Sequence, residues 1–93
     1  MKECLIEIGR IVLSKSGRDA GKYFIIYDII DKDYVYIING GLRKISKPKK
    51  KKIKHLELKP VKFDELANKF TSNEMVLDSE VRSAIENYLN TQR

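Results

Sequence analysis

The stretch that decides the fold runs from Ile8 to Lys22 and reads I-G-R-I-V-L-S-K-S-G-R-D-A-G-K. An apolar run, expected as a first strand over residues 5–13, leads into a polar segment that contains two glycines. A second apolar run, residues 23–30, is rich in β-branched and aromatic residues, which favour strands. Glycine tolerates the positive φ angles of tight loops. The stretch therefore predicts two strands joined by a glycine loop, residues 14–21.

Three more strand-like segments follow the first two. Residues 34–38 form the third, and residues 42–46 form the fourth, after Asn-Gly-Gly, a strong hairpin signal. Pro48 then excludes a central strand, because proline cannot donate a hydrogen bond to a sheet. A single turn over residues 52–55 leads to a brief fifth strand, residues 56–58. Five short strands separated by turn signals predict a mainly β fold, a small barrel.

After residue 60 the pattern becomes helical. Asp64 is placed to cap a short helix through Phe70, and Asp78 or Ser79 to cap a second one. The second helix carries one apolar stripe, formed by Val81, Ala84, Ile85, Tyr88 and Leu89. We therefore expect a barrel over residues 1–60 and a C-terminal helical extension over residues 61–93.

Size and composition limit the class of protein. A chain of 93 residues with 42% hydrophobic content is expected to form one globular domain with a modest core. No run approaches the roughly 20 apolar residues of a membrane span, and the N-terminus lacks a signal-peptide pattern. Cys4 is the only cysteine, so we expect an inert buried thiol. These features predict a cytoplasmic protein without membrane contact.

Charge is unevenly placed along the chain, whose formal net charge is +6. Residues 1–60 hold 12 Lys and 3 Arg against 7 acidic residues, a balance of +8. Residues 61–93 hold 4 basic and 6 acidic residues, a balance of −2. This asymmetry predicts a nucleic-acid surface on the first part only.

The densest basic stretch spans residues 43–54, where eight Lys or Arg occur without one acid. A solvated loop that aids solubility is the plain alternative. Adjacent lysines repel one another unless an anion is present, so the density favours phosphate binding. The glycine loop carries a second basic set, Lys15 and Arg18, followed by Lys22. We expect the glycine loop and the lysine segment, residues 47–54, to lie on the same side of the barrel.

Four tyrosines, Tyr23, Tyr27, Tyr34 and Tyr36, fall on the second and third expected strands. Tyrosine on a sheet face can stack on unpaired bases. We interpret these residues instead as filling the edge of a core that has no tryptophan.

Signals of catalysis are weak. His55 is the only histidine and Cys4 the only cysteine, so there is no second residue of either type to build a zinc site. The segment G-R-D-A-G lacks the G-K-[ST] ending of a phosphate-binding P-loop. We therefore predict no enzyme, no metal site, no cofactor and no small-molecule substrate.

The quoted stretch, continued through Y-F-I-I, resembles a KOW motif, in which a loop with a key glycine, here Gly17, joins two strands. Three further segments, D-K-D-Y-V-Y-I-I-N-G-G-L-R-K, I-K-H-L-E-L and D-S-E-V-R-S-A-I-E-N-Y-L, are similar to the "fourteen-e" family of KOW proteins in archaeal and eukaryotic large ribosomal subunits. The resemblance implies an SH3-like barrel, rRNA contacts through residues 15–22 and 43–54, and C-terminal helices that pack on the barrel or meet neighbouring ribosomal proteins. The Ile-, Lys- and Asn-rich composition suggests a bacterial relative of the family.

The leading hypothesis is a non-enzymatic RNA-binding protein that clamps phosphates of rRNA with its two basic segments. The alternatives are an SH3-like adaptor for protein partners and a KOW module associated with transcription elongation. The residues expected to bind RNA are Arg10, Lys15, Ser16, Gly17, Arg18, Gly21, Lys22, Arg43, Lys44, Lys47, Lys49, Lys50, Lys51, Lys52, Lys54 and His55.

Overall fold

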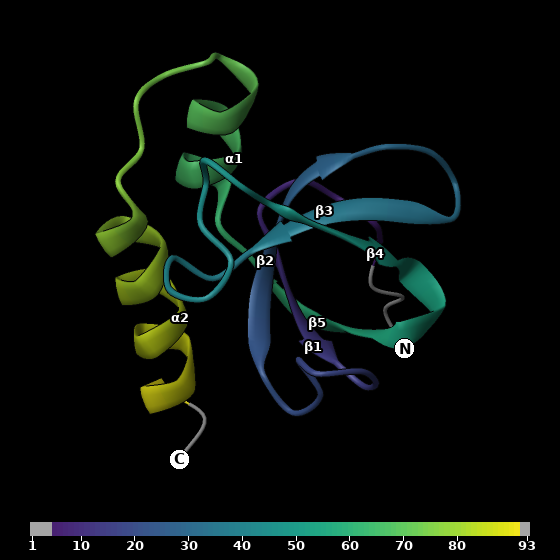
Figure 1. Ribbon diagram of the computed structural model, residues 1–93. Helices are drawn as coiled ribbons and strands as arrows, with labels where there is room; N and C mark the ends of the chain where they lie inside the picture. Colours follow the sequence, from purple (N-terminus) through teal and green to yellow (C-terminus); the bar gives the residue numbers. More distant parts are fainter. Residues whose placement is uncertain (1–4, 92–93) are drawn as a thin grey trace.

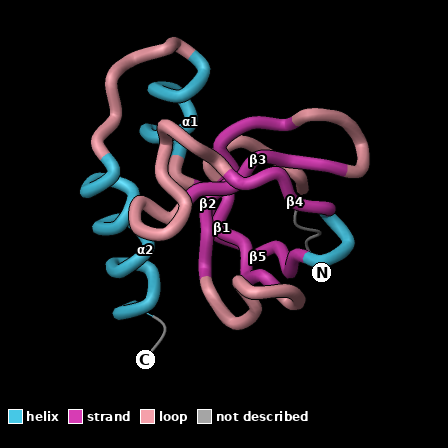
Figure 2. Tube along the Cα trace, in the orientation of Figure 1, coloured by secondary structure: helices cyan, strands magenta, loops and turns pink. Residues whose placement is uncertain are grey.

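Five strands and then two helices make up the fold, as predicted (Figure 1). The computed structural model describes residues 5–91, so Cys4 lies outside the described residues. The elements in chain order are β1 (Arg10–Ser14), β2 (Tyr23–Ile29), β3 (Tyr34–Ile38), β4 (Lys49–Lys52), a 3₁₀ turn η1 (Ile53–His55), β5 (Leu56–Lys62), α1 (Asp64–Thr71) and α2 (Asp78–Thr91). Figure 2 shows both helices together on one side of the strands.

The strands form one antiparallel sheet in the order β4-β3-β2-β1-β5. Its two outermost strands, β4 and β5, are joined directly by η1, so the sheet curls on itself as a small barrel (Figure 2). The register shifts once between β1 and β5 and once between β2 and β3. Such irregularities bend the strands and help the sheet curl.

Apolar side chains pack on both faces of the curled sheet. The inner face forms one cluster, composed of Val12, Phe24, Ile26, Val35, Ile37 and Leu56. The outer face forms a second cluster with the helices, composed of Ile11, Ile25, Ile38, Leu66, Val81, Ile85 and Tyr88. Because both faces of β2 are buried, the strand is apolar at successive positions. For the same reason, the sequence alone did not show which of its side chains point into the barrel. The helices therefore share a core with the sheet.

The fourth strand was predicted wrongly at residues 42–46. That segment is irregular, and β4 is formed instead by the four lysines that follow Pro48, as an edge strand rather than a central one. Asn39 accounts for the difference, because its side-chain oxygen accepts the amide of Arg43 at 2.8 Å and closes a compact loop. The amide of Ile45 donates to the carboxylate of Asp78 at 2.9 Å, so it is not available to β3. Pro48 lies just outside β4, and the expected turn before β5 is confirmed as η1.

Other strand boundaries differ by less. β3 has the predicted bounds, while β1 begins at Arg10 because the backbone turns at Gly9, whose φ is +92°. β5 continues to Lys62, past the predicted end of the strand at residue 58 and past the barrel boundary expected at residue 60. It contains Pro60, which is tolerated because β5 is at the edge of the sheet.

The expected helix caps take other roles. Asp64 is the first residue of α1, and Phe63 occupies the N-cap position without a side-chain hydrogen bond. Asp78 begins α2, and its carboxylate accepts a hydrogen bond from the amide of Ile45. The carboxylate of Glu80 accepts a hydrogen bond from the amide of Leu77, just before the helix, at 3.0 Å. The N-terminus of α2 thus fixes the loop between β3 and β4.

Two glycines allow the helices to approach the barrel closely. A Cβ atom on Gly9 would lie 2.7 Å from the carbonyl oxygen of Phe63 and 2.9 Å from the Cβ of Ala67, in α1. At Gly40, whose φ is +76°, a Cβ atom would overlap the backbone of α2 at Asp78. Side chains at either position would push a helix away from the sheet.

Candidate nucleic-acid interface

The glycine loop is a closed backbone turn between β1 and β2. The amide of Gly21 donates to the carbonyl of Ser14 at 2.8 Å, and the amide of Ala20 donates to the carbonyl of Gly17 at 3.2 Å. Both Gly17 and Gly21 have positive φ angles, +78° and +84°. The loop therefore has a defined shape and holds its cationic side chains at set positions; the exposed ones in or beside it are Lys15, Arg18 and Lys22.

The glycine loop lies against the lysine segment, as the sequence predicted. The amide of Lys15 donates to the carbonyl of His55 at 2.9 Å. The ammonium group of Lys51 donates to the carbonyl of Ser16 at 3.0 Å. These two contacts join segments 35 or more residues apart in the chain. The cations of both segments consequently share one region of the surface.

The lysines of β4 are divided between the two faces of the sheet. Lys50 pairs with Tyr36 and Lys52 pairs with Tyr34, so these two lysines share the face on which the tyrosines lie. Lys49 and Lys51 lie opposite the buried residues of β3, on the face toward the glycine loop. A continuous lysine run thus presents charge in two directions, which a flexible connection would not do.

Arg43 is held by an acid that the sequence analysis did not single out. Its Nε and Nη2 atoms donate to Oδ2 of Asp19 at 3.2 and 3.1 Å. The Asp19 side chain is 2% exposed, and that of Arg43 is 27% exposed. The bond joins the loop that follows β3 to the glycine loop. A lone acid inside a basic loop is the only sequence signal that pointed to Asp19.

Arg10 is not part of the exposed surface. It is 8% exposed, and its guanidinium donates to the carbonyl of Lys59 at 2.9 Å and to the carboxylate of Glu7 at 2.8 Å. Hydrogen bonds from Arg10 and then Lys62 hold the pKa of the Glu7 carboxyl below its ordinary value. Arg10 therefore ties β1 to β5, and we leave it out of the interface.

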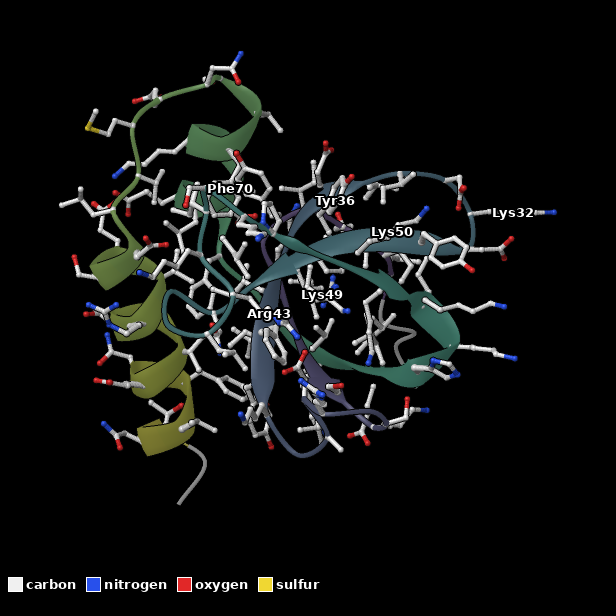
Figure 3. The ribbon with its side chains drawn as sticks, viewed as in Figure 1. Lys32, Tyr36, Arg43, Lys49, Lys50 and Phe70 are labelled. Carbon is white, nitrogen blue, oxygen red and sulfur yellow. The ribbon has the colours of Figure 1, made fainter. Side chains whose placement is uncertain are left out.

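Five of the predicted residues also line a hollow beside β4. The hollow has a volume of about 510 Å³ and is lined in part by Arg43, Lys44, Lys47, Lys49 and Lys50. Figure 3 shows Arg43 and Lys49 near one another beneath β4. Lys44, Lys47 and Lys54 are exposed, and His55 is half-buried. The structure thus gathers most of the predicted cations around the glycine loop and β4.

The four tyrosines separate into two pairs. Tyr23 packs on Tyr88 of α2, with ring centroids 5.9 Å apart, and Tyr27 packs edge-on against Phe70 of α1 at 5.0 Å. This first pair fills the core edge, as the sequence analysis interpreted it. Tyr34 and Tyr36 of β3 do not contact the helices in this way and lie beside the lysines of β4.

Within residues 5–91, no three His, Cys, Asp or Glu side chains are grouped so as to hold a metal ion. Neither α1 nor α2 has the length and apolar character that crossing a bilayer requires.

Comparison with known proteins identifies the family. No family model matches the chain. Large ribosomal subunit protein eL14 of Sulfolobus acidocaldarius is 37% identical over 81 residues, which cover 87% of this chain and 77% of that protein. The eL14 of Saccharolobus islandicus is 36% identical over 81 residues, covering the same shares. The eL14 of Desulfurococcus amylolyticus is 46% identical over 52 residues, 56% of this chain and 54% of that protein.

These relatives are archaeal, and the bacterial origin suggested by composition stays a prediction. The KOW-type resemblance is confirmed, since the matches to two of these relatives span most of the chain. The five-stranded curled sheet, the two C-terminal helices and this identity together place the chain in the family of large ribosomal subunit protein eL14.

Proposed function

We propose that the chain is a non-enzymatic RNA-binding protein of the large ribosomal subunit that clamps rRNA phosphates between its glycine loop and its lysine segment. The observation that carries this proposal is the junction of the two segments through Lys51 with Ser16 and Lys15 with His55. Two basic segments fixed against each other form one cationic surface. A cytoplasmic ribosome is the corresponding location.

The pairing of the cations supports this choice of surface. Near the helices, Lys62 pairs with Glu7 and Asp64, and Lys69 pairs with Glu65 and Glu80. Among the described residues, no lysine of β4 or of the glycine loop pairs with an acid. Unneutralised cations repel one another, and an RNA backbone relieves that repulsion while releasing counterions.

Contacts of this type position an RNA rather than read its sequence. Lysine and arginine bonds to phosphates give affinity and orientation but carry no base information. The defined shape of the glycine loop, held by its own backbone hydrogen bonds, favours a structured RNA whose phosphates match it. The proposed target is therefore a folded segment of rRNA.

The helices provide a different surface, which we assign to neighbouring ribosomal proteins. A groove of about 560 Å³ lies between α1 and α2, where three apolar residues, Phe63, Leu66 and Ala84, are surrounded by polar and charged ones. Nearby, Met75 is 87% exposed and Leu77 is 59% exposed. The charges beside the groove are paired with one another, so this side favours protein over RNA.

The salt dependence of RNA binding tests the clamp. If about six to eight cations meet phosphates, log K for an rRNA fragment should fall against log salt with a slope of about −4 to −7. The single substitutions Lys15→Gln and Lys54→Gln should each weaken the slope by about 1 for every RNA sequence. Filter binding or fluorescence anisotropy at several salt concentrations measures the slope.

The matched control is Lys69→Gln, which removes the same charge from the helix side. Its ion pairs with Glu65 and Glu80 are at the surface, so the substitution should change stability by about 1 kcal/mol or less. The slope should then equal that of the unmodified protein. A slope near −1 for the unmodified protein, or equal slopes for all three variants, contradicts the clamp.

A further inference from the structure

One exposed face of the sheet carries two lysines of the lysine segment and is turned away from the glycine loop. Tyr34 and Tyr36 of β3 alternate with buried Val35 and Ile37, so both rings lie on the outer side of the sheet. Lys52 and Lys50 lie directly opposite them on β4. We call these four residues, Tyr34, Tyr36, Lys50 and Lys52, the tyrosine face. Figure 3 labels two of them, Tyr36 and Lys50.

The two rings of the tyrosine face differ in what covers them. The ammonium groups of Lys50 and Lys52 lie 4.8 and 5.8 Å from the centroid of the Tyr34 ring, within reach of a cation–π contact. Tyr36 is 36% exposed, and within residues 5–91 no aromatic or cationic group covers its ring. Tyr36 is thus an open aromatic surface beside two lysines.

The position of β4 connects the tyrosine face to the clamp. β4 is the last strand of the sheet, so no further strand lies beyond its outer edge. Lys51, between the two lysines of the tyrosine face, points the other way and bonds Ser16 in the glycine loop. An RNA strand that crosses this edge can therefore contact the clamp on one side and Tyr36 on the other.

We propose that the tyrosine face binds an unpaired nucleobase, which stacks on Tyr36 while Lys50 and Lys52 contact the flanking phosphates. Stacking of an unpaired base on an exposed aromatic ring, with cations for the backbone, is how sheet faces commonly bind single-stranded RNA. The inference rests on the proposed function, because it assigns the clamped RNA an unpaired nucleotide next to its structured part. The cations around Tyr36 favour this occupant over an apolar protein segment.

Two substitutions at one position test the stacking. Tyr36→Leu removes the aromatic ring and keeps an apolar side chain, whereas Tyr36→Phe keeps the ring and serves as the matched control. With an RNA hairpin that carries an unpaired loop, Tyr36→Leu should weaken binding by about 5- to 150-fold, and Tyr36→Phe should bind as the unmodified protein does. The slope of log K against log salt should stay the same in both, because no phosphate contact is lost.

The RNA supplies a second test that does not depend on the folding of a variant. Replacing the loop nucleotides by abasic ones should weaken binding to the unmodified protein by a similar factor, and a blunt duplex should bind all three proteins equally. Stacking is overturned if the unmodified protein binds the abasic and intact hairpins equally, or if Tyr36→Leu has no effect. The absence of salt-dependent binding to any of these RNAs would overturn the clamp itself.

Discussion

At the residue scale, Asp19 shows how an acid can serve a basic surface. It is almost fully buried, and one carboxylate oxygen accepts two hydrogen bonds from Arg43. The other oxygen has no partner among the described residues. The pair links the loop after β3, which α2 fixes through Asp78, to the glycine loop. We infer that Asp19 sets the position of the cations around it rather than binding RNA.

Removing Arg43 should therefore reduce stability. Arg43→Ala leaves the Asp19 carboxylate buried without a partner, which should lower the free energy of unfolding by about 1–3 kcal/mol. The double variant Asp19→Ala/Arg43→Ala should recover part of that loss, because no unpaired charge remains buried. Urea unfolding followed by circular dichroism measures each value.

The neighbouring residue provides the control. Lys44 is exposed, and its side chain forms no ion pair within residues 5–91, so Lys44→Ala should change stability by about 0.5 kcal/mol or less. Equal stability of Arg43→Ala and Lys44→Ala would show that the Asp19 contact contributes nothing.

At the element scale, the secondary structure of β4 is set by pairing with a neighbouring strand, and that of α2 is set by its own sequence pattern. Lysine is depleted in strands, so four lysines in succession indicate a loop. They form a strand here because the edge of β3 has free backbone hydrogen-bonding groups, with which β4 pairs. Edge strands also favour lysine, because charge discourages pairing with another chain. In contrast, α2 follows its apolar periodicity, and Val81, Ile85 and Tyr88 are buried against the sheet.

The apolar stripe of α2 should contribute unequally to stability. Ile85 is 7% exposed within the cluster that joins α2 to the sheet, so Ile85→Ala should cost about 2–5 kcal/mol. Leu89, on the same expected stripe, is 37% exposed, and Leu89→Ala should cost about 1 kcal/mol or less. Chemical unfolding of both variants gives the comparison, and similar losses at the two positions would mean that α2 does not pack as described.

The exposed side of α2 also contacts the loop after β3. Arg82 and Glu86 are spaced to form an ion pair along the helix, but Arg82 donates instead to the carbonyl of Gly40. The contact adds to the bond between Asp78 and Ile45, so α2 holds the loop after β3 at two points. The helix that carries no predicted RNA contact thus determines where Arg43 lies.

At the scale of the whole molecule, the uneven charge of the sequence becomes an uneven surface. Most exposed cations without acid partners lie around the glycine loop and β4. Near the helices, Lys62 and Lys69 pair with neighbouring acids, and Arg82 bonds the carbonyl of Gly40. One side is therefore suited to RNA, and the other to protein neighbours. This division distinguishes the proposed function from that of an adaptor, for which the lysines would only aid solubility.

Sedimentation of cell extract should show whether RNA contacts or protein contacts account for association with the ribosome. We expect the protein to migrate with the large ribosomal subunit in a sucrose gradient and to move to the light fractions after ribonuclease treatment. The reason is that phosphate contacts supply most of the affinity in the proposed clamp. Recovery of the same protein partners with and without ribonuclease would favour the adaptor, and a free light fraction at low salt would contradict ribosome association.

The sequence by itself determined the elements whose signals are local. β-Branched and aromatic residues indicated β2 and β3, helical spacing indicated α2, and the run of lysines indicated the basic side. The positive φ angles at Gly17 and Gly21 also agree with their places in the glycine loop. Each of these properties depends on neighbouring residues, so the order of residues is sufficient to predict it.

Only the tertiary structure decided the features that depend on partners distant in the chain. The lysines became β4 because β3 offered an open edge, Arg43 turned to Asp19, and Arg10 was buried by Glu7 and the carbonyl of Lys59. The two apolar faces of β2 were both used because the helices cover one of them. Polar groups form hydrogen bonds with whichever partners the fold brings close to them. The spacing of residues along the sequence does not show which distant residues become neighbours.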